Sequence, residues 1–303
     1  MALSRISDSQ VFSFLTDRVG RQQVRINSLQ EAIASGKRFA SPDEDPLGAA
    51  QVVRLDGSVS ALGQYAESSR FGTDVLGAQD DALGQAGNLL VRAQEIATQQ
   101  ASGLVGPEER AAAEQEVHGL LEGLTALGNS EQGGRRLFGG LALDAAAPFV
   151  DPPADLTAYD PTTAYAGSTQ DFFVKVGSSA TERVRISTRG DTVFQSSLQA
   201  LQDLWTALHT NGNIAGTLSG LAQGRADLAA ERASVGARQA QLLDRTSQVS
   251  SLTTQQQKAL STVQDADLAT VITQLTQAQT ALQATLAAGA QLAQTSLVNL
   301  LKI

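Results

Sequence analysis

Apolar side chains at both ends of the chain recur at the spacing of a helical seam, and no other feature constrains the fold as strongly. The first series runs from Phe12 to Ile33 in alternating steps of three and four residues, with Gln22 as its one polar member. The second follows one face from Leu268 to Leu300. Such steps place side chains along one side of a helix, as in a coiled coil. Both ends are therefore predicted to be long helices that need a partner surface.

This predicted assembly seam comprises Phe12, Leu15, Val19, Ile26, Leu29, Ile33, Leu268, Ile272, Leu275, Leu282, Leu286, Leu297 and Leu300. One interpretation is an antiparallel coiled coil that ties the two ends of the chain together. The other is that the same helices also pack against further copies of the chain. Small side chains between Ala281 and Ala293 favour the second, because they permit close approach of helix backbones.

Further helical patterns are expected between the ends. Asp45 followed by Pro46 is a good N-cap and first helical residue, and the pattern after it reaches about Asn129, with a new start at Pro107. Glycines inside this stretch each cost about 1 kcal/mol relative to alanine, unless close packing compensates. A later segment repeats apolar residues every seven positions, at Leu221, Leu228, Val235, Leu242 and Val249.

The chain changes character between residues 138 and 194, where four of its seven prolines lie. Val174 and Val176 alternate with outward-facing positions, and so do Val184 and Ile186. Gly177 lies between the two runs, which is the arrangement of a β-hairpin. This stretch is predicted to be a small β-containing insertion.

Together these patterns predict a mainly α protein, an elongated helical hairpin with terminal coiled-coil helices and a small inserted β domain. The predicted terminal coiled-coil domain comprises residues 1–44 and 262–303, and the helical rod comprises 45–137 and 195–261. Residues 138–194 form the predicted outer domain. The predicted inter-domain turn contains Gly36, Lys37, Arg38, Pro42 and Pro46. In it, Gly36 is expected to end the first helix in the left-handed conformation.

Composition removes several classes of function. The chain has no cysteine, which excludes disulfides, thiolate nucleophiles and cysteine-based zinc sites. Its formal net charge of −9 argues against binding to nucleic acid, which requires clustered Lys and Arg. No stretch reaches the roughly 18 apolar residues of a membrane span, and the first ten residues lack the apolar core of a cleavable signal. We therefore expect no nucleic acid and no membrane as partner, and export by an unconventional route stays open.

No catalytic residue, metal site or cofactor is expected, and the chain is predicted not to be an enzyme. His118 and His209 are the only histidines, and without a partner motif both are predicted to be structural or solvated. Lys37 does not belong to a phosphate-binding loop, because Glu31 stands where such a loop requires its first glycine. The acidic residues at 43–45 lack the spacing of an EF-hand and are expected to cap or turn the chain.

Short motifs along nearly the whole chain resemble the flagellin and hook-associated protein family of bacterial flagella. They are SGKR at 35–38, PDEDPLGAA at 42–50, LFGG at 137–140, GDTVF at 190–194, ASVGAR at 233–238 and the C-terminal segment 265–301. Their order and their placement at both ends carry the resemblance, which is weakest at 145–166. Lys37, Pro42 and Pro46 favour the junction members of this family over the flagellins themselves.

The resemblance implies a structural subunit of the flagellum that acts in motility as an adaptor at the hook–filament junction. Its implied partners are hook-associated protein 1 below, flagellin above and neighbouring copies of the same chain in a ring. It also implies type III export from the cytoplasm without a cleaved signal peptide, a cytosolic export chaperone and an extracellular location. Two alternatives stay open: a flagellin that forms the filament itself, and an unrelated secreted coiled-coil binding protein.

Overall fold

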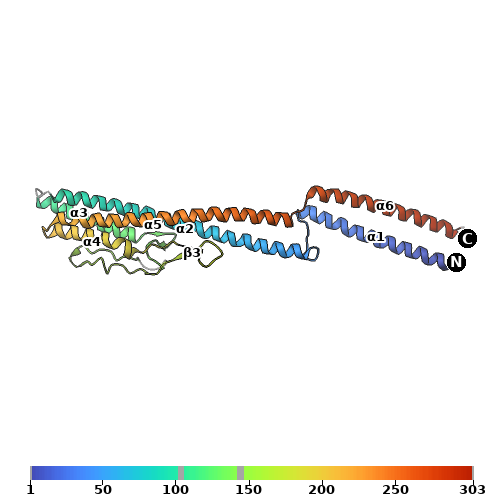
Figure 1. The fold of residues 1–303 in the computed structure, drawn as a ribbon, viewed down its shortest axis with the longest axis horizontal. Helices are drawn as coiled ribbons and strands as arrows, with labels where there is room; N and C mark the ends of the chain where they lie inside the picture. The colour runs from blue at the N-terminus through green and yellow to red at the C-terminus, as the bar shows by residue number, and fades with distance from the viewer. Residues whose placement is uncertain (1, 102–105, 142–146, 302–303) are drawn as a thin grey trace. The chain divides into compact units, whose positions relative to one another are not determined.

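The computed structural model describes residues 2–101, 106–141 and 147–301, which contain six α-helices and two small antiparallel sheets (Figure 1). The helices are α1 (Ala2–Ser35), α2 (Pro46–Gln100), α3 (Pro107–Gly128), α4 (Gly190–His209), α5 (Ile214–Gln264) and α6 (Leu268–Leu301). The smaller elements are β1 (Glu131–Gln132), β2 (Arg135–Arg136), the 3-10 turn η1 (Leu156–Ala158), β3 (Phe173–Lys175) and β4 (Arg183–Arg185). The mainly α fold with a small β insertion is thus confirmed.

Two compact units divide the chain. The terminal unit comprises Met1–Ala61 and Thr253–Ile303, and the central unit comprises Leu62–Leu252. Helices α2 and α5 have residues in both units. The finer division into three domains, with an outer domain at 138–194, stays a prediction.

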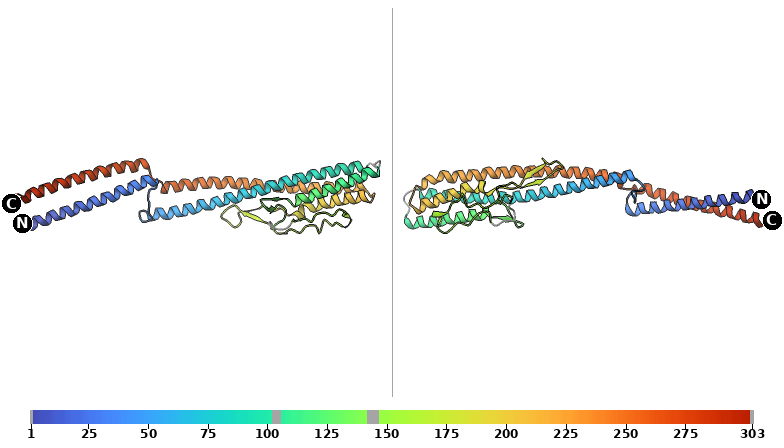
Figure 2. Two further views of the ribbon diagram at one scale, coloured as in Figure 1. Left: turned by 180° about the vertical axis from the view of Figure 1, so that it is seen from behind. Right: turned by 90° about the horizontal axis from the view of Figure 1, so that it is seen from below.

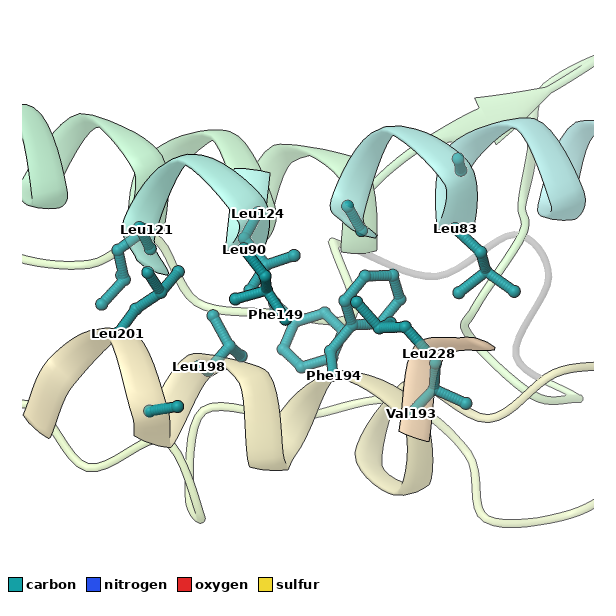
Figure 3. Packing of buried hydrophobic residues seen from close by; sticks show 14 of the residues in the cluster. Leu83, Leu90, Leu121, Leu124, Phe149, Val193, Phe194, Leu198, Leu201 and Leu228 are labelled. Carbon is teal, nitrogen blue, oxygen red and sulfur yellow. The ribbon is translucent and has the colours of Figure 1, made fainter. Parts of the chain in front are cut away.

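The core of the central unit forms along the heptad of α5. Leu221, Leu228, Val235 and Leu242 are all at most 1% exposed and belong to one apolar cluster. Figure 3 shows how this cluster closes between helices: Leu121 and Leu124 of α3, Leu198 and Leu201 of α4, and Leu90 of α2 point toward one another. The seven-residue repeat therefore predicted the buried face of α5 correctly.

Aromatic side chains from the insertion belong to the same cluster as the helices. Phe194 packs edge-on against Phe138 and Phe149, with ring centres 4.8 and 5.7 Å away. Figure 3 shows the rings of Phe194 and Phe149 next to each other. Gly128 at the end of α3 and Gly190 at the start of α4 flank Phe149 so closely that a Cβ atom at either position would overlap its ring. The insertion is therefore part of the main core, and glycine at both positions makes room for one buried ring.

The two ends of the insertion lie next to each other. Gly139 and Arg189 form an antiparallel bridge, and the Gly190 N–H donates to the Phe138 carbonyl at 3.0 Å. The Tyr165 hydroxyl donates to the same carbonyl at 3.0 Å. Because Gly140 has φ +63° and no room for a Cβ atom beside the Ser168 carbonyl, only glycine suits this position. The LFGG and GDTVF motifs thus close the base of the insertion together.

The predicted hairpin is confirmed as β3 and β4, which pair with Val174 opposite Val184. Both valines are buried, while Phe173, Lys175 and Arg183 lie on the outer side. The alternation of inward and outward residues in the sequence therefore reflects one buried face of a two-stranded sheet.

A buried polar cluster ties the returning chain after β4 to α2 and α5. Gln79 of α2 is fully buried, donates to the carbonyls of Leu137 and Ile186 at 2.9 and 3.0 Å, and accepts from the Thr188 hydroxyl at 2.9 Å. Arg238 of α5 donates to the Ser187 carbonyl at 3.0 Å and pairs with Glu231. Burial lowers the pKa of the Arg238 guanidinium, and the Glu231 carboxylate opposes that shift.

Carboxylate caps explain where α2 and α6 begin. The Asp45 side chain accepts from the Gly48 N–H at 2.8 Å, and Asp267 accepts from the Ala269 N–H at 3.1 Å. Each bond satisfies a backbone donor that the first turn of a helix leaves free. The Gly48 N–H, followed by the Arg38 guanidinium, lowers the pKa of Asp45.

Loss of the Arg238 side chain should destabilise the central unit. Arg238→Ala leaves the Glu231 carboxylate and the Ser187 carbonyl without their shared donor, which we expect to cost about 3 kcal/mol of unfolding free energy. The matched control is Arg232→Ala on the same helix, where the Arg232–Asp80 pair is solvent-exposed and should contribute less than about 1 kcal/mol. Urea unfolding followed by the fluorescence of Trp205, which lies in the core, measures both. Equal costs would contradict the role of the cluster.

The Asp45 cap should be sensitive to acid. Because its pKa is lowered in the folded protein, its stabilisation is complete above the unfolded value of 3.8 and is lost as the pH falls through the folded pKa. The NMR shift of the Gly48 amide should therefore titrate with a midpoint below 3.8. Asp45→Asn retains a capping oxygen but cannot titrate, so its Gly48 shift should stay flat. A midpoint at or above the unfolded value would show that the cap does not favour the ionised carboxylate.

Candidate assembly interface

Helices α1 and α6 pack side by side and antiparallel within the terminal unit (Figures 1 and 2). Leu15 in the first half of α1 lies against Gly289 in the second half of α6, and the Gln22 amide donates to the Ala278 carbonyl at 3.3 Å. This pairing is the antiparallel arrangement that the simpler interpretation of the two terminal patterns predicted.

The predicted seam residues of α1 lie mostly on the contact side of the helix. Ile26 is buried, while Leu15, Val19, Leu29 and Ile33 are half-buried. Gln22 shares this face and is half-buried too. Phe12 differs, because 67% of its surface is exposed. Among the described side chains, the spacing in the sequence therefore identified the contact face of α1 but also included the exposed Phe12.

On α6, the structure separates the predicted seam into two rows. Leu275 and Leu282 are half-buried within the pair. Leu268, Ile272 and Leu286 remain 46%, 52% and 51% exposed, although each is a large apolar side chain. We call these three residues the uncovered α6 stripe. Leu297 and Leu300 lie among the residues whose side chains the structure does not describe.

Small and polar residues complete the contact face of α6, and the sequence interpretation missed most of them. Ala278 is buried, and Val271, Thr285 and Gly289 are half-buried. A Cβ atom at Gly289 would overlap the Leu15 side chain, so glycine sets the closest approach of the two helices. With Leu275 and Leu282 these residues follow one another in steps of four and three, a signal that was present in the sequence.

The alanine-rich part of α6 is mostly free of α1. Of the small residues between 281 and 290, Gly289 packs against α1, while Ala281, Ala284, Ala287, Ala288 and Ala290 are exposed. Together with the uncovered α6 stripe, they give α6 a broad surface of small and apolar side chains that the single chain does not use.

The predicted turn connects α1 to α2 and also pairs with the segment that enters α6. Gly36 has φ +69°, which confirms the left-handed end of α1. Lys37 bridges to Asp265, with hydrogen bonds from the Arg38 N–H to the Gln264 carbonyl at 2.7 Å and from the Ala266 N–H to the Gly36 carbonyl at 2.9 Å. The two connections of the terminal unit therefore support each other.

Side chains stiffen the rest of this turn. The Arg38 guanidinium donates to Asp45 at 2.8 Å, and the Glu44 carboxylate accepts from the Ala40 N–H at 2.9 Å. Pro46 is the first residue of α2, and Pro42 lies exposed in the turn. The role of this turn between domains stays a prediction.

The two histidines contact neighbouring segments of the central unit. His118 contacts the Pro153 carbonyl at 3.0 Å, and His209 lies 2.9 Å from Glu114 and stacks on Trp205. In the described ranges, His, Asp and Glu do not gather into a group of three or more that could hold a metal ion. None of the described helices combines the length and hydropathy needed to cross a bilayer.

Two family models match the chain. The bacterial flagellin N-terminal helical region matches residues 6–142, and the bacterial flagellin C-terminal helical region matches residues 218–301. The unmatched middle contains most of the insertion, the stretch where the motif resemblance is also weakest.

Individual relatives point the same way. Flagellar hook-associated protein 3 of Salmonella typhimurium is 30% identical over 146 residues, which is 48% of this chain and 46% of that protein. The chain therefore matches about half the length of this curated relative.

Solved structures share the fold. Xanthomonas campestris FlgL superposes with a TM-score of 0.59 and 17% identity, covering 68% of this chain and 99% of that one. The flagellar junction protein FlgL from Legionella pneumophila has a TM-score of 0.52 and 12% identity, covering 72% of this chain and 100% of that one.

The family resemblance that the motifs indicated is thus confirmed at both ends of the chain and in the fold. With both helical regions present around one insertion, the chain belongs to the bacterial flagellin family of flagellar structural proteins.

Proposed function

We propose that this chain is the adaptor at the hook–filament junction, with hook-associated protein 1 below it, flagellin above it and further copies of itself around a ring. The observation that carries the proposal is the uncovered α6 stripe in a chain whose relatives include a hook-associated protein and share the fold of a junction protein. Its activity is to hold neighbouring subunits, and no chemical step is needed.

The uncovered α6 stripe supports assembly through the terminal helices. Full burial of a Leu or Ile side chain contributes about 1.5–3 kcal/mol, so covering a half-exposed one contributes about 1 kcal/mol. A ring or tube multiplies this gain over many copies. Exposed alanines on the same helix let another backbone approach closely. These residues therefore suit a contact that forms only when subunits come together.

The turn between α1 and α2 favours the function of a junction adaptor over that of a filament protein. Proline fixes the backbone at positions 42 and 46, and the Arg38–Asp45 ion pair and the Lys37–Asp265 bridge hold the segments beside it. A stiff turn limits the arrangements in which the terminal helices can be presented to a neighbour. An interface that accepts one partner below and a different one above requires features that disfavour repeated self-addition.

Export and location follow as part of the same proposal. A flagellar junction subunit must leave the cytoplasm, and we propose that it does so by type III export without a cleaved signal peptide, held beforehand by a cytosolic chaperone. The exposed apolar residues of α6 give such a chaperone a reason to bind, because they would otherwise associate prematurely. The mature location is then extracellular, at the junction.

Flagellin remains the second candidate, because the family models describe flagellin regions. Growth of the purified chain into filaments would favour it. Membership of the flagellin family leaves no support for an unrelated secreted coiled-coil protein.

Charges in the uncovered α6 stripe test the proposal without unfolding the monomer. The double variant Ile272→Asp and Leu286→Asp changes side chains that are already half-exposed, so helicity should be retained. On assembly, each charge would be buried without a partner, at a cost of several kcal/mol. A strain carrying this variant in place of the native chain should not swim and should release flagellin subunits into the medium.

The double variant Gln255→Asp and Gln257→Asp on α5 is the matched control, because it adds the same two charges at exposed positions of the terminal unit outside α6. That strain should swim normally. Normal swimming by the double variant would show that the uncovered α6 stripe takes no part in assembly.

A further inference from the structure

A surface groove of the central unit combines aromatic rings with unpaired cations. It lies between α2 and the β3–β4 hairpin and is lined by Glu67, Phe71, Arg135, Phe172, Phe173 and Lys175, among others. Phe173 is 39% exposed at its rim. Exposed aromatic and Arg side chains in one concave patch are typical of protein interfaces.

Arg135 and Lys175 of the lining, and Arg183 opposite Lys175 in the hairpin, each face a ring in place of a carboxylate. The Arg135 guanidinium lies 5.2 Å from the centre of the Phe71 ring, Lys175 lies 5.7 Å from that of Tyr65, and Arg183 lies 4.7 Å from that of Phe173. Within the described part of the chain, none of the three cations forms an ion pair with a carboxylate. An aromatic ring attracts a cation but does not neutralise its charge. All three therefore remain available to an anionic partner.

The groove is a local positive surface on a negative chain. Glu67 is the one carboxylate in its lining, while the nearby Asp171 and Glu182 are already paired with Arg185 and Arg245. The chain as a whole carries a formal charge of −9. Copies of this chain therefore repel one another in general, and a contact between them is favoured where this groove meets a carboxylate-rich surface.

The central unit carries such a surface on a different element. The loop at residues 151–160 contains exposed Asp151, Asp155 and Asp160 and no Lys or Arg. Hydrogen bonds from Thr157 and Thr162 lower the pKa of Asp155 and Asp160, so both stay ionised. The loop is fixed to α3 and α4 by the His118–Pro153 contact and by the bond from Gln202 to the Leu156 carbonyl.

We propose that the cationic groove of one copy receives the acidic 151–160 loop of a second copy of this chain. The proposal rests on the ring of neighbouring copies in the proposed function and names a contact within it. A contact that joins one patch on a copy to a different patch on the next copy is heterologous. It can repeat from copy to copy, and the copies close into a ring when the rotation between them permits. Charge complementarity selects the register, and the exposed Phe173 ring adds apolar contact at the rim.

Lys175 makes a direct test possible, because it is the only lysine between residues 62 and 252. A carbodiimide joins amines to carboxylates that touch. We would treat an equal mixture of 15N-labelled and unlabelled full-length chain at low salt and analyse the joined peptides by mass spectrometry. Peptides that join Lys175 to the 151–160 loop, with one labelled and one unlabelled half, are the expected result. High salt should reduce them several-fold, because screening weakens exposed charge pairs.

Variants outside Lys175 separate specific docking from chance encounters. The double variant Arg135→Glu and Arg183→Glu should lower the yield of the Lys175 cross-link several-fold, while Arg225→Glu, an exposed cation on α5, should leave it unchanged. Circular dichroism checks that each variant keeps its helices. Mixing the groove variant with a loop variant, Asp155→Lys and Asp160→Lys, should restore cross-links between the two changed surfaces.

The proposal is overturned if Lys175 is joined only within one chain, only to the terminal unit, or not at all. It is also overturned if the groove variant cross-links as well as the native chain. Loss of this contact alone would leave the proposed junction function standing, since that function is tested on α6 by swimming. If both the groove–loop contact and the swimming defect of the α6 variant were absent, the proposed assembly would be wrong as a whole.

Discussion

The contact between α1 and α6 joins the two ends of the chain. It buries few hydrophobic side chains, and the proposed assembly depends on those that it leaves exposed. In the part of the terminal unit whose side chains are described, Ile26 and Ala278 are the only buried hydrophobic residues. The central unit, in contrast, buries a continuous cluster that includes the α5 heptad. The central unit therefore has what it needs to fold by itself, whereas the proposed assembly would supply most of the burial of the terminal helices.

Helix α5 has two rows with different tasks. Its apolar row, from Leu221 to Leu242, packs into the core of the central unit. Glu231, Arg238 and Arg245 form the polar row, and each follows a member of the apolar row by three residues. These side chains bond to the insertion or to one another. Polar groups are favoured there because the insertion presents two acceptors, the Ser187 carbonyl and the Glu182 carboxylate, and one donor, the Thr188 hydroxyl. The ASVGAR motif thus ends on the guanidinium that anchors the returning chain.

Much of this arrangement could be predicted, and the failures have physical causes. The terminal helices, the α5 heptad, the β3–β4 hairpin and the Gly36 cap follow from local spacing and backbone preference. The contact face of α6 was predicted only in part, because Leu and Ile dominate an apolar pattern, while Ala278, Thr285 and Gly289 also make the contact. The sequence patterns also did not predict that the insertion is part of the main core. That packing depends on Phe149 meeting Gly128 and Gly190, residues far apart in the sequence.

The central claim is that the chain completes a junction and does not propagate a filament. The most direct measurement is seeded growth: purified full-length chain is mixed with flagellin filament fragments at high concentration and examined by electron microscopy. The account predicts that the chain adds to fragment ends without elongating them, and that flagellin added afterwards polymerises on top of it. Growth of the chain alone into long filaments would contradict the account and identify it as a flagellin.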